Sequence, residues 1–287
     1  MRKPYFWTMQ VRTYETNRFG MVNNVSYLNF LEEAATQASA AAGYPMEWYW
    51  SQQCMWLIRK MTIRYERPAF HGDELEIETW VSDFQRVRSN RDYVIRRQGQ
   101  RIVRARANWV FVNAETLRPQ RLDSGFAASF GKPDGALESI PVRLRHPHII
   151  DRPRMFITEH EVKSYEIDMV GHVNNSMYPR WTEHAALSAL RQIGWSFERQ
   201  QAELNAVFVM VGREIEYFQS VKEGDTVRIF THLAEVTRAR AAMVHEVRHA
   251  ETNELLVQDY SVGALVNHAT MRPVILPSSL LDGFTAQ

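Results

Sequence analysis

An aspartate and a histidine lie four residues apart in the segment 168–175, which reads DMVGHVNN. The segment comes directly before a predicted helix, and Gly171 permits a tight turn within it. A carboxylate can act as a general base or a nucleophile, and an imidazole can orient a group or carry a proton. Unpaired N–H groups at a helix start can stabilise an oxyanion. Acyl transfer to water needs a base beside such a site, so Asp168 and His172 are the candidate catalytic residues.

The stretch that contains this loop occurs twice in the chain. Residues 11–34 read VRTYETNRFGMVNNVSYLNFLEEA, and residues 162–185 read VKSYEIDMVGHVNNSMYPRWTEHA. The register continues beyond the motif and drifts only by short insertions, which loops tolerate. Further pairs in this register are Gly43 with Gly194, Ile63 with Ile215, Tyr65 with Tyr217, and Pro119 with Pro273. The repeat therefore predicts a duplicated domain rather than a chance match.

The predicted domain organisation follows from the repeat. Residues 1–131 form the first unit and residues 155–287 the second, each large enough for its own core. Residues 132–154 contain several prolines and are poorly periodic, which is typical of a linker.

Each unit is predicted to contain one short strand, one long helix and then a series of strands. Apolar residues recur at helical spacing after each motif, and Gly43 and Gly194 supply stop signals. Alternation with a period of two follows, for example at Leu75, Ile77 and Thr79. The fold class is therefore α+β: two tandem units, each an antiparallel sheet curled around its helix.

The composition is that of an ordinary globular protein. The chain of 287 residues is 45% hydrophobic and 23% charged, with a formal net charge of +1, which gives no reason to expect nucleic acid or a membrane as a partner. Cys54 is the single cysteine, which excludes an internal disulfide and favours a reducing compartment. The chain begins with no apolar run of secretory length, so we expect a cytoplasmic protein. No metal site and no cofactor are expected, because the histidines have no ligand spacing and no glycine-rich phosphate loop is present.

Both copies share one motif: Tyr-Glu, then Asp or Asn two residues later, then Gly, Val-Asn-Asn and Tyr. This motif resembles that of the hotdog-fold thioesterases. The tandem arrangement resembles the acyl-acyl carrier protein thioesterases, and the single motif also resembles 4-hydroxybenzoyl-CoA-type thioesterases. This resemblance implies that two hotdog units pair side by side with active sites at their interface. The chain would then be an internal pseudo-dimer, with a further homo-oligomer possible.

The resemblance assigns roles unequally to the two copies. Asp168 matches the family's general base or nucleophile, and His172 matches its motif histidine. Val170 and Ser220 stand where the plant-type motif has an asparagine and a glutamate, so the full plant-type set is not present. In the first copy, Asn17 replaces the aspartate, and asparagine cannot accept a proton at neutral pH. We therefore expect one working site, in the second unit.

Six other polar residues of the two motifs are assigned supporting or substrate-binding roles. The repeated asparagines suit turns and helix caps, the tyrosine suits the core, and the helix glutamate suits a place behind the catalytic residues. These residues are Asn17, Asn24, Asn174, Asn175, Tyr178 and Glu183.

The function expected from the sequence is hydrolysis of a fatty or related acyl thioester carried by acyl carrier protein or coenzyme A. Two alternatives stay open: a non-catalytic acyl-thioester binding or sensor module, and a hotdog dehydratase or hydratase. The segment Arg86–Arg106 holds eight arginines and one acid, Asp92. It is either a solvated strand face or a docking surface for an acidic carrier.

Overall fold

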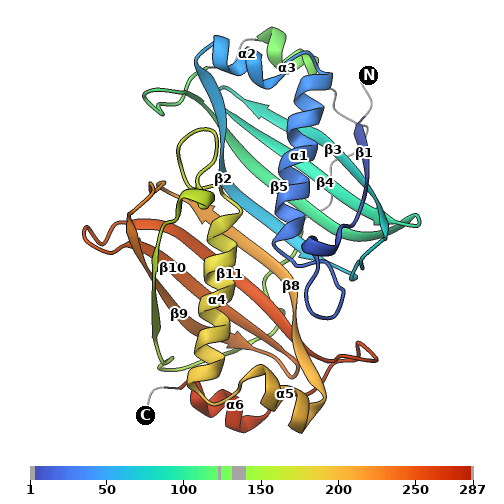
Figure 1. Cartoon of the computed structure of the whole chain (residues 1–287), viewed down its shortest axis with the longest axis vertical. Helices are drawn as coiled ribbons and strands as arrows, with labels where there is room; N and C mark the ends of the chain where they lie inside the picture. Colours follow the sequence, from blue (N-terminus) through green and yellow to red (C-terminus); the bar gives the residue numbers. More distant parts are fainter. Residues whose placement is uncertain (1–3, 122–123, 131–139, 286–287) are drawn as a thin grey trace. The chain divides into compact units, whose positions relative to one another are not determined.

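The computed structural model describes residues 4–121, 124–130 and 140–285. The chain divides into two compact units, Met1–Pro141 (unit 1) and Val142–Gln287 (unit 2), drawn in Figure 1. Positions 132–139 of the expected linker lie outside the described residues.

Unit 1 is one antiparallel sheet with a long helix across it. The strands are ordered β1-β3-β4-β5-β2, and every neighbouring pair is antiparallel. Its elements are β1 (Tyr5–Gln10), the 3-10 turn η1 (Thr13–Glu15), α1 (Ser26–Ala41), α2 (Met46–Ser51), β2 (Cys54–Tyr65), β3 (Glu74–Gln85), β4 (Arg88–Arg97), β5 (Gln100–Asn113) and α3 (Ser124–Ser129).

Unit 2 repeats this topology. Its strands are ordered β8-β11-β10-β9, and β9 also pairs with both β6 and β7. Its elements are β6 (His148–Ile149), β7 (Phe156–Glu161), the 3-10 turn η2 (Ser164–Glu166), α4 (Met177–Gln192), α5 (Phe197–Leu204), β8 (Ala206–Tyr217), β9 (Thr226–Val236), β10 (Arg240–His249), β11 (Leu255–Asn267) and α6 (Ser278–Gly283). The predicted α+β class with antiparallel sheets is confirmed.

Small residues bring each long helix close to its sheet. In α1 the buried face includes Ala34, Ala35 and Ala38, and in α4 it includes Ala185 and Ala189. Beyond both helices the chain turns at a glycine in the left-handed region, as predicted: Gly43 has φ +98° and Gly194 has φ +80°.

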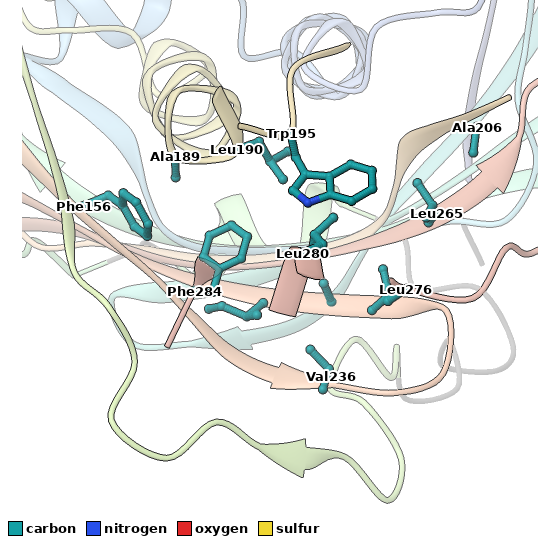
Figure 2. Close-up of a cluster of buried hydrophobic side chains, with 12 residues drawn as sticks. Phe156, Ala189, Leu190, Trp195, Ala206, Val236, Leu265, Leu276, Leu280 and Phe284 are labelled. Atoms are coloured by element: carbon teal, nitrogen blue, oxygen red, sulfur yellow. The ribbon is translucent and has the colours of Figure 1, made fainter. Parts of the chain in front are cut away.

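The hydrophobic core of unit 2 extends from α4 to Phe284. Figure 2 shows Trp195 and Leu190 beside Leu280 and Phe284 of the last segment. Phe156 of β7 stacks edge-on against Phe284 with ring centroids 5.5 Å apart. The carboxyl-terminal segment is therefore part of the core that supports α4.

The interior of unit 2 also contains a buried ion pair, at positions where unit 1 has uncharged residues. Arg213 Nε lies 3.2 Å from Asp259 Oδ1, and both side chains are fully buried. Thr182 of α4 donates a hydrogen bond of 2.6 Å to Asp259 Oδ2. The repeat places Met61 and Ala105 of unit 1 at the positions of this arginine and aspartate.

A second buried polar group lies on the same sheet. His245 Nδ1 is 2.8 Å from Thr231 Oγ1, and its Nε2 is 3.2 Å from Ser261 Oγ. Burial is the main cause that lowers the pKa of His245 to about 4, and Arg213 and His232 lower it further, while Asp259 opposes them. His245 is therefore neutral at physiological pH.

Candidate active site

The loop that follows η2 is closed by Asp168. Its Oδ1 accepts hydrogen bonds from the N–H groups of Val170 (2.8 Å) and His172 (3.5 Å). The Asp168 N–H donates to the His172 carbonyl (2.9 Å), and the Gly171 N–H donates to the Asp168 carbonyl (3.0 Å). Gly171 has φ +82°, a conformation that glycine adopts without strain. The spacing of four residues thus reflects a closed turn.

One carboxylate oxygen is left over from this turn. Asp168 is half-buried, and its Oδ2 accepts no hydrogen bond from any residue that the structure describes. The imidazole of His172, also half-buried, likewise has no hydrogen-bond partner within the described ranges. Both groups are thus available to water or substrate.

The start of α4 offers fewer free amides than the sequence led us to expect. Asn174 Oδ1 accepts the Ser176 N–H (2.8 Å), and the Asn174 carbonyl accepts the Met177 N–H (2.9 Å). Pro179 has no N–H to donate. In the first turn, the Tyr178 N–H remains without an acceptor among the residues described, so one backbone donor is available to an oxyanion.

Asn175 and Tyr178 belong to the framework of the loop. Tyr217 donates a hydrogen bond of 3.0 Å to the Asn175 carbonyl, and its ring lies 5.8 Å from that of Tyr178. Burial raises the pKa of Tyr178 far above its ordinary value, so its hydroxyl is no acid or base near neutral pH. Glu183 is half-buried further along α4, outside the loop.

The equivalent loop of unit 1 has the same geometry without the carboxylate. Asn17 Oδ1 accepts from the N–H groups of Phe19 (2.9 Å) and Met21 (3.3 Å). The Asn17 N–H donates to the Met21 carbonyl (2.8 Å), and Tyr65 donates to the Asn24 carbonyl (2.9 Å). The loop can therefore close around an amide, and its fold does not require the carboxylate of Asp168.

Sequence reasoning missed a buried carboxylate directly before the loop. Glu166 is 3% exposed. Its side chain accepts hydrogen bonds from the Lys163 N–H (2.8 Å), Trp181 Nε1 (2.8 Å) and His160 Nε2 (2.8 Å). The signal was present in the sequence, because a Tyr-Glu pair precedes both Asn17 and Asp168.

Most of the arginine-rich segment is engaged within unit 1. Five of its arginines are ion-paired with a carboxylate: Arg96, Arg97, Arg101, Arg104 and Arg106. In one of these pairs, Arg106 Nε lies 2.6 Å from Asp92 Oδ1. Of the eight arginines, Arg86, Arg88 and Arg101 are exposed. Arg86 and Arg88 lie on a hairpin where Gln85–Arg88 line a hollow of about 450 Å³. These ion pairs favour the interpretation of the segment as a strand face over a docking surface.

Metal binding and membrane insertion also bear on the kind of site. Within the described ranges, no three or more His, Cys, Asp or Glu side chains are grouped so as to hold a metal ion. No helix among the described residues is both long and apolar enough to cross a membrane.

Unit 2 has a long helix on an antiparallel sheet with the Asp168 loop at the helix start, which is the arrangement implied by the resemblance of its motif to the hotdog-fold thioesterases. Comparison with known families agrees for both units. Residues 3–130 match the acyl-ACP thioesterase N-terminal domain, and residues 162–284 match the thioesterase-like superfamily. The resemblance drawn from the repeated motif is thus confirmed, because each unit matches a thioesterase family.

Individual proteins that resemble this chain are also thioesterases. The chain is 23% identical over 223 residues to the chloroplastic palmitoyl-acyl carrier protein thioesterase of Cuphea hookeriana, covering 72% of this chain and 49% of the relative. The chain thus spans about half the length of the curated relatives that it matches. The structure of an acyl-ACP thioesterase from Bacteroides thetaiotaomicron superposes with a TM-score of 0.71 at 17% identity, over 91% of this chain and 97% of that one. The 12:0-ACP thioesterase from Umbellularia californica gives 0.70 at 16% identity, over 91% and 94%. These two likenesses establish the fold.

Proposed function

We propose that the chain is a thioester hydrolase that cleaves a fatty or related acyl group from acyl carrier protein, releasing the free acid and the carrier thiol. The observation that carries the proposal is the Asp168 carboxylate, which closes its loop through Oδ1 and keeps Oδ2 for water or substrate. The match of residues 3–130 to an acyl-ACP thioesterase domain supports the carrier protein as partner. Coenzyme A is the alternative carrier.

The proposed reaction needs an attacking oxygen, a donor for the oxyanion and a proton for the leaving sulfur. In the general-base route, Asp168 takes a proton from water while the water oxygen bonds to the thioester carbon. In the covalent route, Asp168 attacks that carbon, and water then hydrolyses the acyl anhydride. In both routes the carbon–sulfur bond breaks, the Tyr178 N–H binds the oxyanion, and His172 delivers a proton to the sulfur. Turnover in isotopically labelled water separates the routes, because only the covalent one can place label in Asp168.

The central test measures free-thiol release from acyl-ACP and acyl-CoA panels. Asp168→Asn should lower kcat by at least about 100-fold, because it removes the base or nucleophile. It should leave the melting temperature nearly unchanged, since Asn17 closes the same turn in unit 1. The matched variant Asn17→Ala should change kcat by less than about threefold.

Two outcomes would contradict the proposed activity, and a third would contradict the role of Asp168. Tight acyl-thioester binding without thiol release from any substrate would favour the sensor module. Loss of water from a hydroxyacyl thioester, with the thioester left intact, would favour the dehydratase. Undiminished turnover by Asp168→Asn would remove Asp168 from the mechanism.

The arrangement of the two units is a further part of the proposal. We infer that residues 1–131 and 155–287 are paired hotdog units of an internal pseudo-dimer, joined by the linker 132–154. The shared strand order of the two units and their 24-residue repeated motif support this arrangement. Small-angle scattering and light scattering of the intact chain would test it and would detect any further homo-oligomer.

A cytoplasmic location also stays a prediction, based on the single cysteine of the chain. Cell fractionation followed by immunodetection would test it.

A further inference from the structure

Glu166 joins three elements around the Asp168 loop. Its carboxylate receives the Lys163 N–H at the start of η2, His160 Nε2 from β7 and Trp181 Nε1 from α4, each at 2.8 Å. An ionised carboxylate only accepts hydrogen bonds, so His160 must carry its proton on Nε2. The His160 and Trp181 rings also lie against each other, with centroids 4.6 Å apart.

The main chain of the same residue closes the loop from the other side. The Glu166 carbonyl accepts the Asn174 N–H at 2.9 Å, so residues 166 and 174 bracket both Asp168 and His172. A displacement of Glu166 would therefore move both ends of the candidate catalytic loop.

Unit 1 provides a comparison within the same chain. Glu15 occupies the equivalent position, is 7% exposed, and accepts from the Arg12 N–H (2.8 Å) and Arg12 Nη1 (3.3 Å). Its carbonyl accepts the Asn23 N–H at 2.8 Å. However, Met9 and Phe30 stand at the positions of His160 and Trp181, and neither side chain has an N–H to donate. The link from the carboxylate to both strand and helix is thus a feature of the unit that carries Asp168.

We propose that Glu166, held by His160 and Trp181, is a positioning residue that fixes the Asp168 loop for thioester hydrolysis. The proposal rests on the function proposed above. Glu166 does not contact the substrate in this role; it acts through the loop. Unit 1, whose loop contains no carboxylate, has the equivalent glutamate, Glu15, but has no N–H donor at the positions of His160 and Trp181.

The state of Glu166 suits this role. Burial by itself would raise the pKa of its carboxyl group, but the hydrogen bonds from Lys163, His160 and Trp181 lower it below the ordinary value. The group is therefore ionised at neutral pH. Glu166→Gln keeps the shape but places an NH₂ donor against other donors, which should loosen the contacts to β7 and α4.

Steady-state kinetics of the full chain provide the first test. Glu166→Gln should lower kcat by about 10- to 100-fold with KM within about twofold, because the attacking group is misplaced while acyl binding is kept. His160→Met and Trp181→Phe, which introduce chemistry like that of unit 1, should lower kcat in the same manner but less. Glu15→Gln is the matched control and should leave kcat unchanged. Equal losses of kcat in Glu15→Gln and Glu166→Gln would overturn the proposal.

Hydrogen exchange provides a second test that does not depend on turnover. The amides of Val170 and His172 bond to Asp168 Oδ1, so they report the order of the loop. Their exchange should accelerate by about tenfold or more in Glu166→Gln and stay unchanged in Glu15→Gln. Unchanged exchange in Glu166→Gln would overturn the positioning role. A wild-type chain without turnover would instead contradict the proposed function itself, and full activity of Asp168→Asn would remove Asp168 from the mechanism.

Discussion

At the scale of single residues, the two repeats distinguish the groups that close the loop from the group that catalysis requires. Asp168 and Asn17 accept equivalent backbone N–H groups through one side-chain oxygen, so an amide suffices for the turn. The negative charge of Asp168 is surplus to this structural role. Such a surplus is a better indicator of function than the motif, because the motif is present in both units.

His172 gives a prediction at the same scale. His172→Met introduces the residue found at the equivalent position of unit 1, Met21. No hydrogen bond of the imidazole to a described residue is lost, so the melting temperature should stay within about 2 °C. The value of kcat should fall by about tenfold or more, because methionine cannot transfer a proton to the leaving sulfur. Unchanged kinetics would remove His172 from the proton path.

The sequence was sufficient to find the candidate catalytic residues but not those that hold them. Asp168 and His172 lie in one short motif, where spacing alone brings them together. Glu166, His160 and Trp181 lie on a turn, a strand and a helix, and their contacts depend on how these elements pack. Hydrogen bonds between separate elements leave no periodic signal in a sequence. The comparison of the two repeats, position by position, is what makes them visible.

At the scale of elements, periodicity predicted the long helices, their glycine ends and the antiparallel strands. In the first part of β3, Leu75, Ile77 and Thr79 face inward as the alternation predicts. The alternation fails in the second part of the strand. Beyond them Trp80, Val81 and Ser82 are all buried, and a register shift interrupts the pairing with β4 after Val81. Such a bulge is set by the neighbouring strand and not by local residue preference.

The buried ion pair between β8 and β11 gives a prediction about elements. Removing one partner leaves an uncompensated buried charge, so Arg213→Met or Asp259→Ala alone should destabilise unit 2 by about 3–5 kcal/mol. Both changes together introduce the residues of unit 1 and should cost less than either alone, since no charge is left unpaired. Urea unfolding of the two single variants and the double variant would measure this coupling. Additive losses would show that the pair contributes only through packing.

At the scale of the whole molecule, two units of one topology have interiors of different chemistry. Unit 2 buries His245 and half-buries His232, and burial lowers the pKa of both. The position equivalent to His245 in unit 1 is Tyr93, which has no charge to gain in acid. The chain should therefore respond unequally to mild acid.

The sign of this response follows from proton linkage. Unfolding restores the ordinary pKa of His245, near 6.5. Below that pH the imidazole of the unfolded state binds a proton, whereas that of the folded state stays neutral. Its contribution to stability is thus complete above about pH 6.5 and falls as the pH drops toward 4, by about 3 kcal/mol in all. The lowered carboxyl pKa values of Glu66 in unit 1 and Glu166 in unit 2 have effect only below their ordinary value of 4.5. Between pH 6.5 and about 4.5, the loss should therefore be confined to unit 2.

Hydrogen exchange across this window would measure the effect in each unit. The amides of β10 should lose protection, after correction for intrinsic exchange rates, while those of β4 in unit 1 keep theirs. His245→Gln removes the titrating group and retains hydrogen-bonding capacity toward Thr231 and Ser261, so it should flatten most of the pH dependence of β10. An equal loss of protection in β4 and β10 would assign the acid response to groups other than the buried histidines. Because the candidate loop lies in unit 2, acyl-thioester turnover should fail in mild acid before unit 1 unfolds.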